Sequence, residues 1–135
     1  MVSFYLISCR ELLPDKTTFL PLLENLAKVD ETVVREQATK SLTAIAVKLS
    51  DAEIQNIFAP MVIRLAQGEW FTGRVSSCAL FYPAYSRSSS QKDKLRKKFI
   101  ELCNEDTPMI RRACASKIGV SLAMSNYKDL CYSTR

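Results

Sequence analysis

The stretch LENLAKVDETVVREQATKSL, residues 23–42, has two counterparts further along the chain. They are VIRLAQGEWFTGRVSSCALF at 62–81 and FIELCNEDTPMIRRACASKI at 99–118. Apolar residues keep their places in all three copies, and so do an acidic residue and an arginine five positions after it. The recurring polar pairs are Asp30 and Arg35, Glu69 and Arg74, and Asp106 and Arg111. A period near 40 residues indicates a chain built from stacked copies of one structural unit.

Each copy contains two segments in which apolar residues recur at spacings of three and four, as on one face of a helix. The first helices are expected at about 15–28, 51–67 and 91–104, and the second helices are expected to be capped by Thr32, Thr72 and Thr107. Two helices per unit of this length predict an all-α HEAT or armadillo solenoid of about three antiparallel hairpins. The whole chain, 1–135, is then one array with units at about 15–50, 51–89 and 90–125, and 1–14 is interpreted as a remnant of a preceding unit.

Short sequence patterns predict where individual helices begin or bend. Ser50 and Glu53 have the spacing of a capping box, in which each side chain accepts a hydrogen bond from the other's backbone amide. Asp15 and Ser90 are expected to begin the other two first helices. Pro21 and Pro60 occupy equivalent places inside apolar patterns and are expected to bend or restart the first helix of their units.

Composition excludes several classes of function. Only three glycines occur, too few for a phosphate-cradling loop, and there is no histidine to serve as a general base or metal ligand. The five cysteines form no C-x-x-C pair, and their wide spacing suits reduced thiols in the cytoplasm or nucleus. No segment is long and apolar enough to span a bilayer, and no leader peptide is evident. We therefore expect no catalytic residue, cofactor, metal or membrane contact, and a cytoplasmic protein.

The net charge of +5 is concentrated in the segment 91–99, QKDKLRKKF. On a helix its basic side chains spread around most of the circumference, which is typical of a solvated face. Nucleic-acid binding through 92–98 stays open as an alternative function, although no nucleic acid is the favoured expectation.

The recurring acid–arginine pairs suggest a structural ladder. The acid lies where a second helix begins, and a negative charge is favoured there. The arginine, one turn into the helix, has a guanidinium group that can bridge carboxylates of its own unit and the next. The ladder is expected to include Arg35, Glu69, Arg74 and Arg111.

The connectors inside the units carry the features of a binding surface. Trp70 and Phe71 lie in one connector, where exposed aromatic residues commonly mark contact with a partner. The connector 104–109, NEDTPM, combines acidic residues, a rigid turn and a soft apolar side chain.

Three segments resemble the scaffold (A) subunit of protein phosphatase 2A: LLPDKTTFLPLLENLAKVDETVVREQATKSL, LAQGEWFTGRVSSCALF and LCNEDTPMIRRACASKIG. The resemblance covers roughly residues 12–119, and GEWFTGR and DTPMIRR are its most specific parts. It implies that the family's scaffold is a horseshoe-shaped solenoid of about fifteen HEAT repeats. This chain would then correspond to about repeats three to five of that solenoid. In that family a regulatory B-type subunit binds the N-terminal repeats and the catalytic subunit the C-terminal ones.

The resemblance also implies which residues contact a B-type subunit, because the within-unit loops form that contact ridge in the family. The implied contacts are Asp30, Glu31, Trp70, Phe71, Asp106, Thr107, Pro108, Met109 and Arg112. A catalytic subunit is expected as a partner only if C-terminal repeats are present. Residues 1–11 and those after Gly119 depart from the family pattern, so a fragment or a non-functional truncated copy is the remaining alternative.

Overall fold

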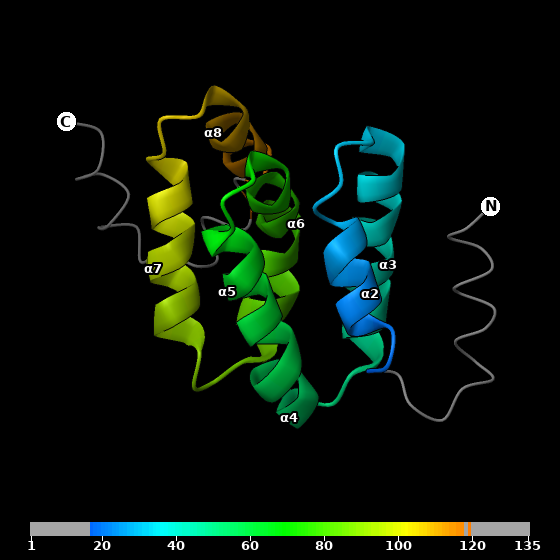
Figure 1. Ribbon diagram of the computed structural model, residues 1–135. Helices are drawn as coiled ribbons and strands as arrows, with labels where there is room; N and C mark the ends of the chain where they lie inside the picture. The colour runs from blue at the N-terminus through cyan, green and yellow to red at the C-terminus, as the bar shows by residue number, and fades with distance from the viewer. Residues whose placement is uncertain (1–16, 118, 120–135) are drawn as a thin grey trace.

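The computed structural model describes residues 17–117 and residue 119 (Figure 1). The expected helix start at Asp15, the remnant over 1–14 and the tail beyond 119 lie outside the described residues. Within them the regular elements are all helical. The elements are, in order, α2 (Leu20–Leu26), α3 (Thr32–Lys48), α4 (Asp51–Glu53), the π-helical turn η1 (Ile54–Phe58), α5 (Ala59–Gln67), α6 (Phe71–Arg87), α7 (Lys92–Cys103) and α8 (Pro108–Ala115).

These elements form three antiparallel hairpins, in which α2 pairs with α3, α4–η1–α5 with α6, and α7 with α8 (Figure 1). The second helices stack in sequence, because α6 packs against both α3 and α8. The connectors within the hairpins lie in the upper half of the view, and those between hairpins lie at the bottom. The predicted all-α solenoid of about three helix hairpins is confirmed.

Both prolines lie in the first turn of a described helix, as the predicted restart of the helix requires. Helix α2 begins at Leu20, directly before Pro21. In the second unit, Pro60 has no amide hydrogen to donate to the preceding turn. The chain there widens into the π-helical turn, in which the Ala59 amide donates to the carbonyl of Ile54, and α5 continues beyond it.

Helix capping agrees with the sequence at one place and differs at others. The capping box is confirmed: the Ser50 amide donates to Glu53 Oε2 at 2.7 Å, and the Glu53 amide donates to Ser50 Oγ at 3.3 Å. The N-cap of α7 is Gln91 and not the expected Ser90, whose hydroxyl instead donates to Gln55 Oε1 at 2.8 Å.

The threonines expected to cap the second helices do not do so. Thr32 is the first residue of α3, and Thr72 is buried inside α6. Thr107 occupies the N-cap position of α8 without a capping hydrogen bond, and its hydroxyl lies 3.3 Å from Glu105 Oε1.

One apolar core runs through all three units. Its largest fully buried side chains are Phe58, Phe81, Leu20, Leu23, Leu42, Leu49, Ile54, Met61, Leu65, Leu80, Leu95 and Ile110. The rings of Phe81 and Phe99 meet edge to face at 5.3 Å and join α6 to α7. Val33 and Val34 are exposed although they are apolar, because the first turn of α3 lies at the loop end of the hairpin.

Candidate loop-ridge interface

Each hairpin turns through a short loop, and the same contact closes it in all three units. In the first unit Arg35 Nη1 donates to the carbonyls of Val29 and Asp30, at 2.9 and 3.0 Å. A loop carbonyl has no partner in a helical ladder, so a guanidinium group that binds two of them stabilises the turn.

The second and third units repeat this geometry. Arg74 Nη1 donates to the carbonyls of Gly68 and Glu69, both at 2.7 Å. Arg111 Nη1 donates to the carbonyls of Glu105 and Asp106, both at 2.8 Å. The recurrence of one arginine per unit therefore reflects one recurring loop closure.

This finding corrects the predicted acid–arginine ladder. Each arginine binds the backbone carbonyl of the recurring acid rather than its carboxylate. The carboxylate of Glu69 forms no ion pair within 17–117, and the side chains of Asp30 and Asp106 are exposed. The physical reason is the spacing, since five residues bring the guanidinium back over the main chain of the loop while the acidic side chain points away from it.

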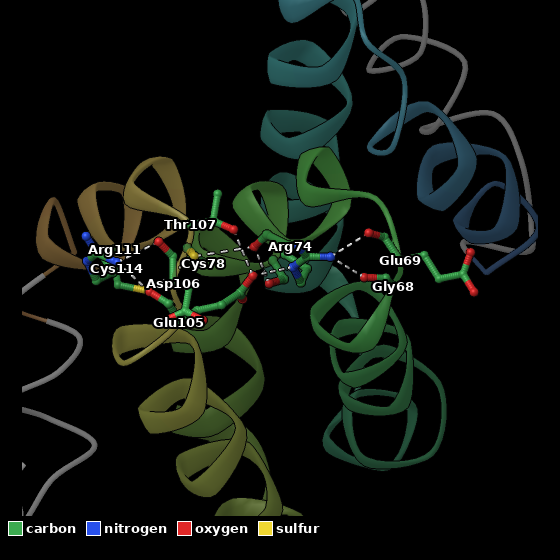
Figure 2. A network of polar contacts seen from close by, with 10 residues as sticks. Gly68, Glu69, Arg74, Cys78, Glu105, Asp106, Thr107, Arg111 and Cys114 are labelled. Atoms are coloured by element: carbon green, nitrogen blue, oxygen red, sulfur yellow. Dashed lines mark hydrogen bonds and ion pairs between the residues drawn. The ribbon is translucent and has the colours of Figure 1, made fainter.

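One of the three recurring arginines also bridges two units. Arg74 Nε donates to Glu105 Oε1 at 2.9 Å, and both side chains are largely covered (Figure 2). Glu105 was missed as a ladder residue because it does not repeat: Gly68 and Val29 stand at the equivalent positions of the other units. A search for any acid in the loop of the unit after that of Arg74 could have found Glu105. A search restricted to acids that recur in every unit could not.

Other polar contacts hold the first loop against the second unit. Thr72 Oγ1 donates to the Lys28 carbonyl at 2.6 Å, and Ser76 Oγ donates to the Ala27 carbonyl at 2.7 Å. Glu24 receives two hydrogen bonds from Arg64, at 2.9 and 3.2 Å. The hydrogen bond to Glu24 raises the pKa of Arg64 above its ordinary value and outweighs the opposing effect of burial.

We call the three within-unit loops, 27–31, 68–70 and 104–107, together with the exposed first residues of the helices that follow them, the loop ridge. Trp70 is the N-cap residue of α6 and is 71% exposed, and Phe71 begins the helix at 39% exposure. Met109, in the first turn of α8, is 53% exposed. Large apolar side chains in solvent at two consecutive loops mark a contact surface better than a single one would.

The remaining contact residues implied by the resemblance lie on the same ridge. Asp30 and Glu31 belong to the first loop, and Asp106 belongs to the third. All three are exposed, as are Pro108 and Arg112 on α8, whereas Thr107 is half-buried. The structure thus brings the implied contact residues to one end of the hairpins.

Two of the five basic side chains in 92–98 are paired with acids. Arg96 pairs with Asp93 at 3.1 Å, and Lys98 pairs with Glu101, both within the helix. Lys92 lies over the ring of Tyr85, with its Nζ 5.4 Å from the ring centroid. The helix keeps a net positive charge, because its five bases face only two acids.

Neither a metal site nor a membrane-spanning helix occurs in the described part of the chain. Between 17 and 117 no three His, Cys, Asp or Glu side chains are grouped as a metal site would require. None of the helices described is long and apolar enough to cross a membrane.

The stacked helix hairpins, with one clamped loop per unit, define the class of the chain: it is a HEAT-repeat solenoid. No family model matches the sequence. The beta isoform of the human protein phosphatase 2A (PP2A) 65 kDa regulatory A subunit is 50% identical over 101 residues, which are 74% of this chain and 17% of that protein. A probable PP2A regulatory subunit of Caenorhabditis elegans is 52% identical over 108 residues, or 78% of this chain and 18% of that protein. The corresponding 65 kDa protein of Drosophila melanogaster is 45% identical over 101 residues, which are 74% of this chain and 17% of that protein.

The chain is therefore a homologue of the 65 kDa regulatory A subunits of PP2A over the segment that they share, and the resemblance predicted from the sequence is confirmed. These relatives are named as regulatory and not as catalytic subunits. The chain spans less than a fifth of the length of the relatives that it matches.

Proposed function

We infer that this chain is a non-catalytic scaffold segment of a PP2A-type serine/threonine phosphatase and that it binds a regulatory B-type subunit through the loop ridge. The observation that carries the proposal is the exposure of Trp70 on a loop that is fixed at both of its ends. Homology to regulatory subunits supplies the class of partner.

The rigidity of the ridge supports this role. Arg74 holds the second loop by two carbonyls and the third loop by Glu105, so two neighbouring loops are fixed relative to each other. A surface that is ordered before binding loses less conformational entropy when a partner docks. Trp70 is therefore presented as a preorganised aromatic anchor, the kind of residue that dominates binding energy at protein interfaces.

The charge of the ridge indicates the chemistry of the partner surface. Asp30, Glu31, Glu69 and Asp106 are exposed acids, and Arg111 and Arg112 are exposed bases beside them. Acidic groups around an apolar centre favour a partner with basic residues around an apolar pocket. An acidic ridge also disfavours nucleic acid, which is itself a polyanion.

A phosphatase catalytic subunit is a further partner in this proposal only where additional C-terminal repeats accompany the segment. In the homologous family that subunit is implied to occupy repeats outside the stretch matched here. The ridge described above thus concerns only the regulatory B-type subunit.

The proposal is tested by calorimetric titration, at low and at raised salt, of the full chain with a purified B-type subunit. We expect saturable binding that weakens only modestly with salt, because an apolar anchor contributes most of the affinity. Absence of binding would exclude the proposed function. Binding of an oligonucleotide that declines steeply with salt would instead favour the nucleic-acid alternative.

A further inference from the structure

A pair of thiols lies at the boundary between the second and third units, away from the exposed ridge. Cys78 projects from α6 and Cys114 from α8, and their sulfur atoms are 3.4 Å apart. Both are buried free cysteines. A disulfide bond brings two sulfurs to about 2.05 Å, so the pair needs an approach of roughly 1.4 Å.

Cys78 borders a groove that opens to solvent, and Cys78 and Cys114 are themselves 1% and 2% exposed. Cys78 lines an open groove of about 330 Å³ between α3, α6 and α8. Arg35, Lys40 and Lys117 line the same groove, with Glu36 as the acidic side chain among them. A groove with three cations and one anion favours the approach of small anionic molecules.

The surroundings of Cys114 give the two sulfurs different roles. A hydrogen bond with Cys103 favours the Cys114 thiolate, but the hydrogen bond with Cys78, burial and the negative charge of Glu105 together raise the pKa of Cys114 to about 12. Cys114 thus keeps its proton at neutral pH and does not attack an oxidant first, because the thiolate is the reactive form. Cys78, which faces the groove, is left as the first sulfur to react.

We propose that Cys78 and Cys114 form a reversible redox pair, oxidised by a small anionic disulfide of the glutathione class that enters the groove. Cys78 attacks one sulfur of that disulfide, forms a mixed disulfide and releases one small thiol. Cys114 then attacks the Cys78 sulfur, and the second small thiol leaves with the proton that Cys114 gives up. Two protein thiols are oxidised to one disulfide, and one small disulfide is reduced to two thiols.

The product would join α6 to α8 covalently beside the contacts that already hold these units together. Cys78 Sγ lies 3.4 Å from the carbonyl of Arg74, and Arg74 in turn binds Glu105 in the third unit (Figure 2). A bond at this place fixes the angle between two neighbouring units of the solenoid. Oxidation therefore stiffens the stack next to the loop ridge without changing any residue of the ridge.

The test uses the full chain with Cys9 and Cys131 replaced by serine, so that only the three cysteines described remain. The reduced protein is incubated with glutathione disulfide, the remaining thiols are alkylated, and intact mass and peptide masses are measured. We expect one peptide pair linked through Cys78 and Cys114, with Cys103 alkylated. We also expect the thermal midpoint to rise by on the order of 10 °C, since the bond closes a long loop.

Variants of each sulfur distinguish the steps. With Cys114→Ser the reaction should stop at a glutathionyl adduct on Cys78, and with Cys78→Ser no link to Cys114 should form. Cys103→Ser is the matched control and should leave the link intact. A link through Cys103, a stable adduct without a link in the parent protein, or a lower midpoint after oxidation would each overturn the proposal.

Discussion

Arg74 Nε and Glu105 Oε1 lie 2.9 Å apart across the boundary between the second and third units. The same guanidinium group binds the carbonyls of Gly68 and Glu69 in its own loop. One side chain therefore closes a hairpin and sets the position of the next hairpin. Because the contact is largely removed from solvent, it is worth more than an exposed ion pair.

Arg74→Ala should lower the free energy of unfolding by about 2 kcal/mol, because it leaves two loop carbonyls and the Glu105 carboxylate without their partner. Urea unfolding followed by circular dichroism measures the change. Arg111→Ala is the matched control: Arg111 closes the third loop in the same way, is exposed and has no acid partner in the described part of the chain. We expect a loss of about 1 kcal/mol or less there, and equal losses in the two variants would show that the bridge to Glu105 contributes nothing.

The sequence predicted the architecture because the apolar spacing and the repeat both reflect burial. Leu23, Leu42 and Leu65 lie in the core as their periodicity requires. The role of the arginine was only half predicted. Repetition showed that an arginine is needed at this position of every unit. Spacing alone does not tell whether its partner is the carboxylate or the backbone carbonyl of the acid at that spacing.

The contact between units could not be predicted from the repeat at all. Glu105 has no counterpart in the other units, so periodicity carries no signal for it. The hydroxyl of Thr72 was expected at a helix cap, but it binds the Lys28 carbonyl of the preceding unit. Contacts of this kind depend on how two hairpins pack, which local sequence patterns do not encode.

Trp70→Ala should weaken binding of the B-type subunit by about 2 kcal/mol, as expected when an aromatic anchor is truncated. The stability of the chain itself should change by no more than about 0.5 kcal/mol, because the side chain is largely in solvent. Calorimetric titration gives the first quantity and thermal unfolding gives the second. Tyr82→Ala is a suitable control, since Tyr82 is an exposed aromatic residue of α6 outside the loop ridge. Unchanged affinity for Trp70→Ala, or an equal loss for both variants, would remove Trp70 from the interface.

Stability should decrease between about pH 9 and pH 12 through the thiol of Cys114. Its folded pKa of about 12 lies above the ordinary 9.0: the hydrogen bond with Cys103 acts in the opposite direction, but the contact with Cys78, burial and the charge of Glu105 outweigh it. The folded chain therefore keeps a proton that the unfolded chain loses in this range, so the stabilisation is complete below pH 9 and disappears as pH approaches 12. Urea unfolding under reducing conditions at several pH values, compared with Cys114→Ala, isolates the effect. Parallel pH profiles for the two proteins would contradict it.

Amide exchange should be slowest in α6. This helix packs against α3, α5, α7 and α8, whereas α2 has its main described contacts with α3 alone. Amides in the buried stretch from Ser76 to Phe81 open only when both neighbouring units separate, so their exchange should approach the rate set by global unfolding. Helix α2 should exchange faster, because beyond α3 it is held mainly by the pair of hydrogen bonds from Arg64 to Glu24, and local separation of stacked units costs less than unfolding the whole array. Hydrogen exchange read by mass spectrometry resolves the helices individually, and the Arg74→Ala variant should raise exchange in α8 more than in α3. Equal protection of α2 and α6 would show that α2 is packed on a second side and that the three units unfold as one cooperative body.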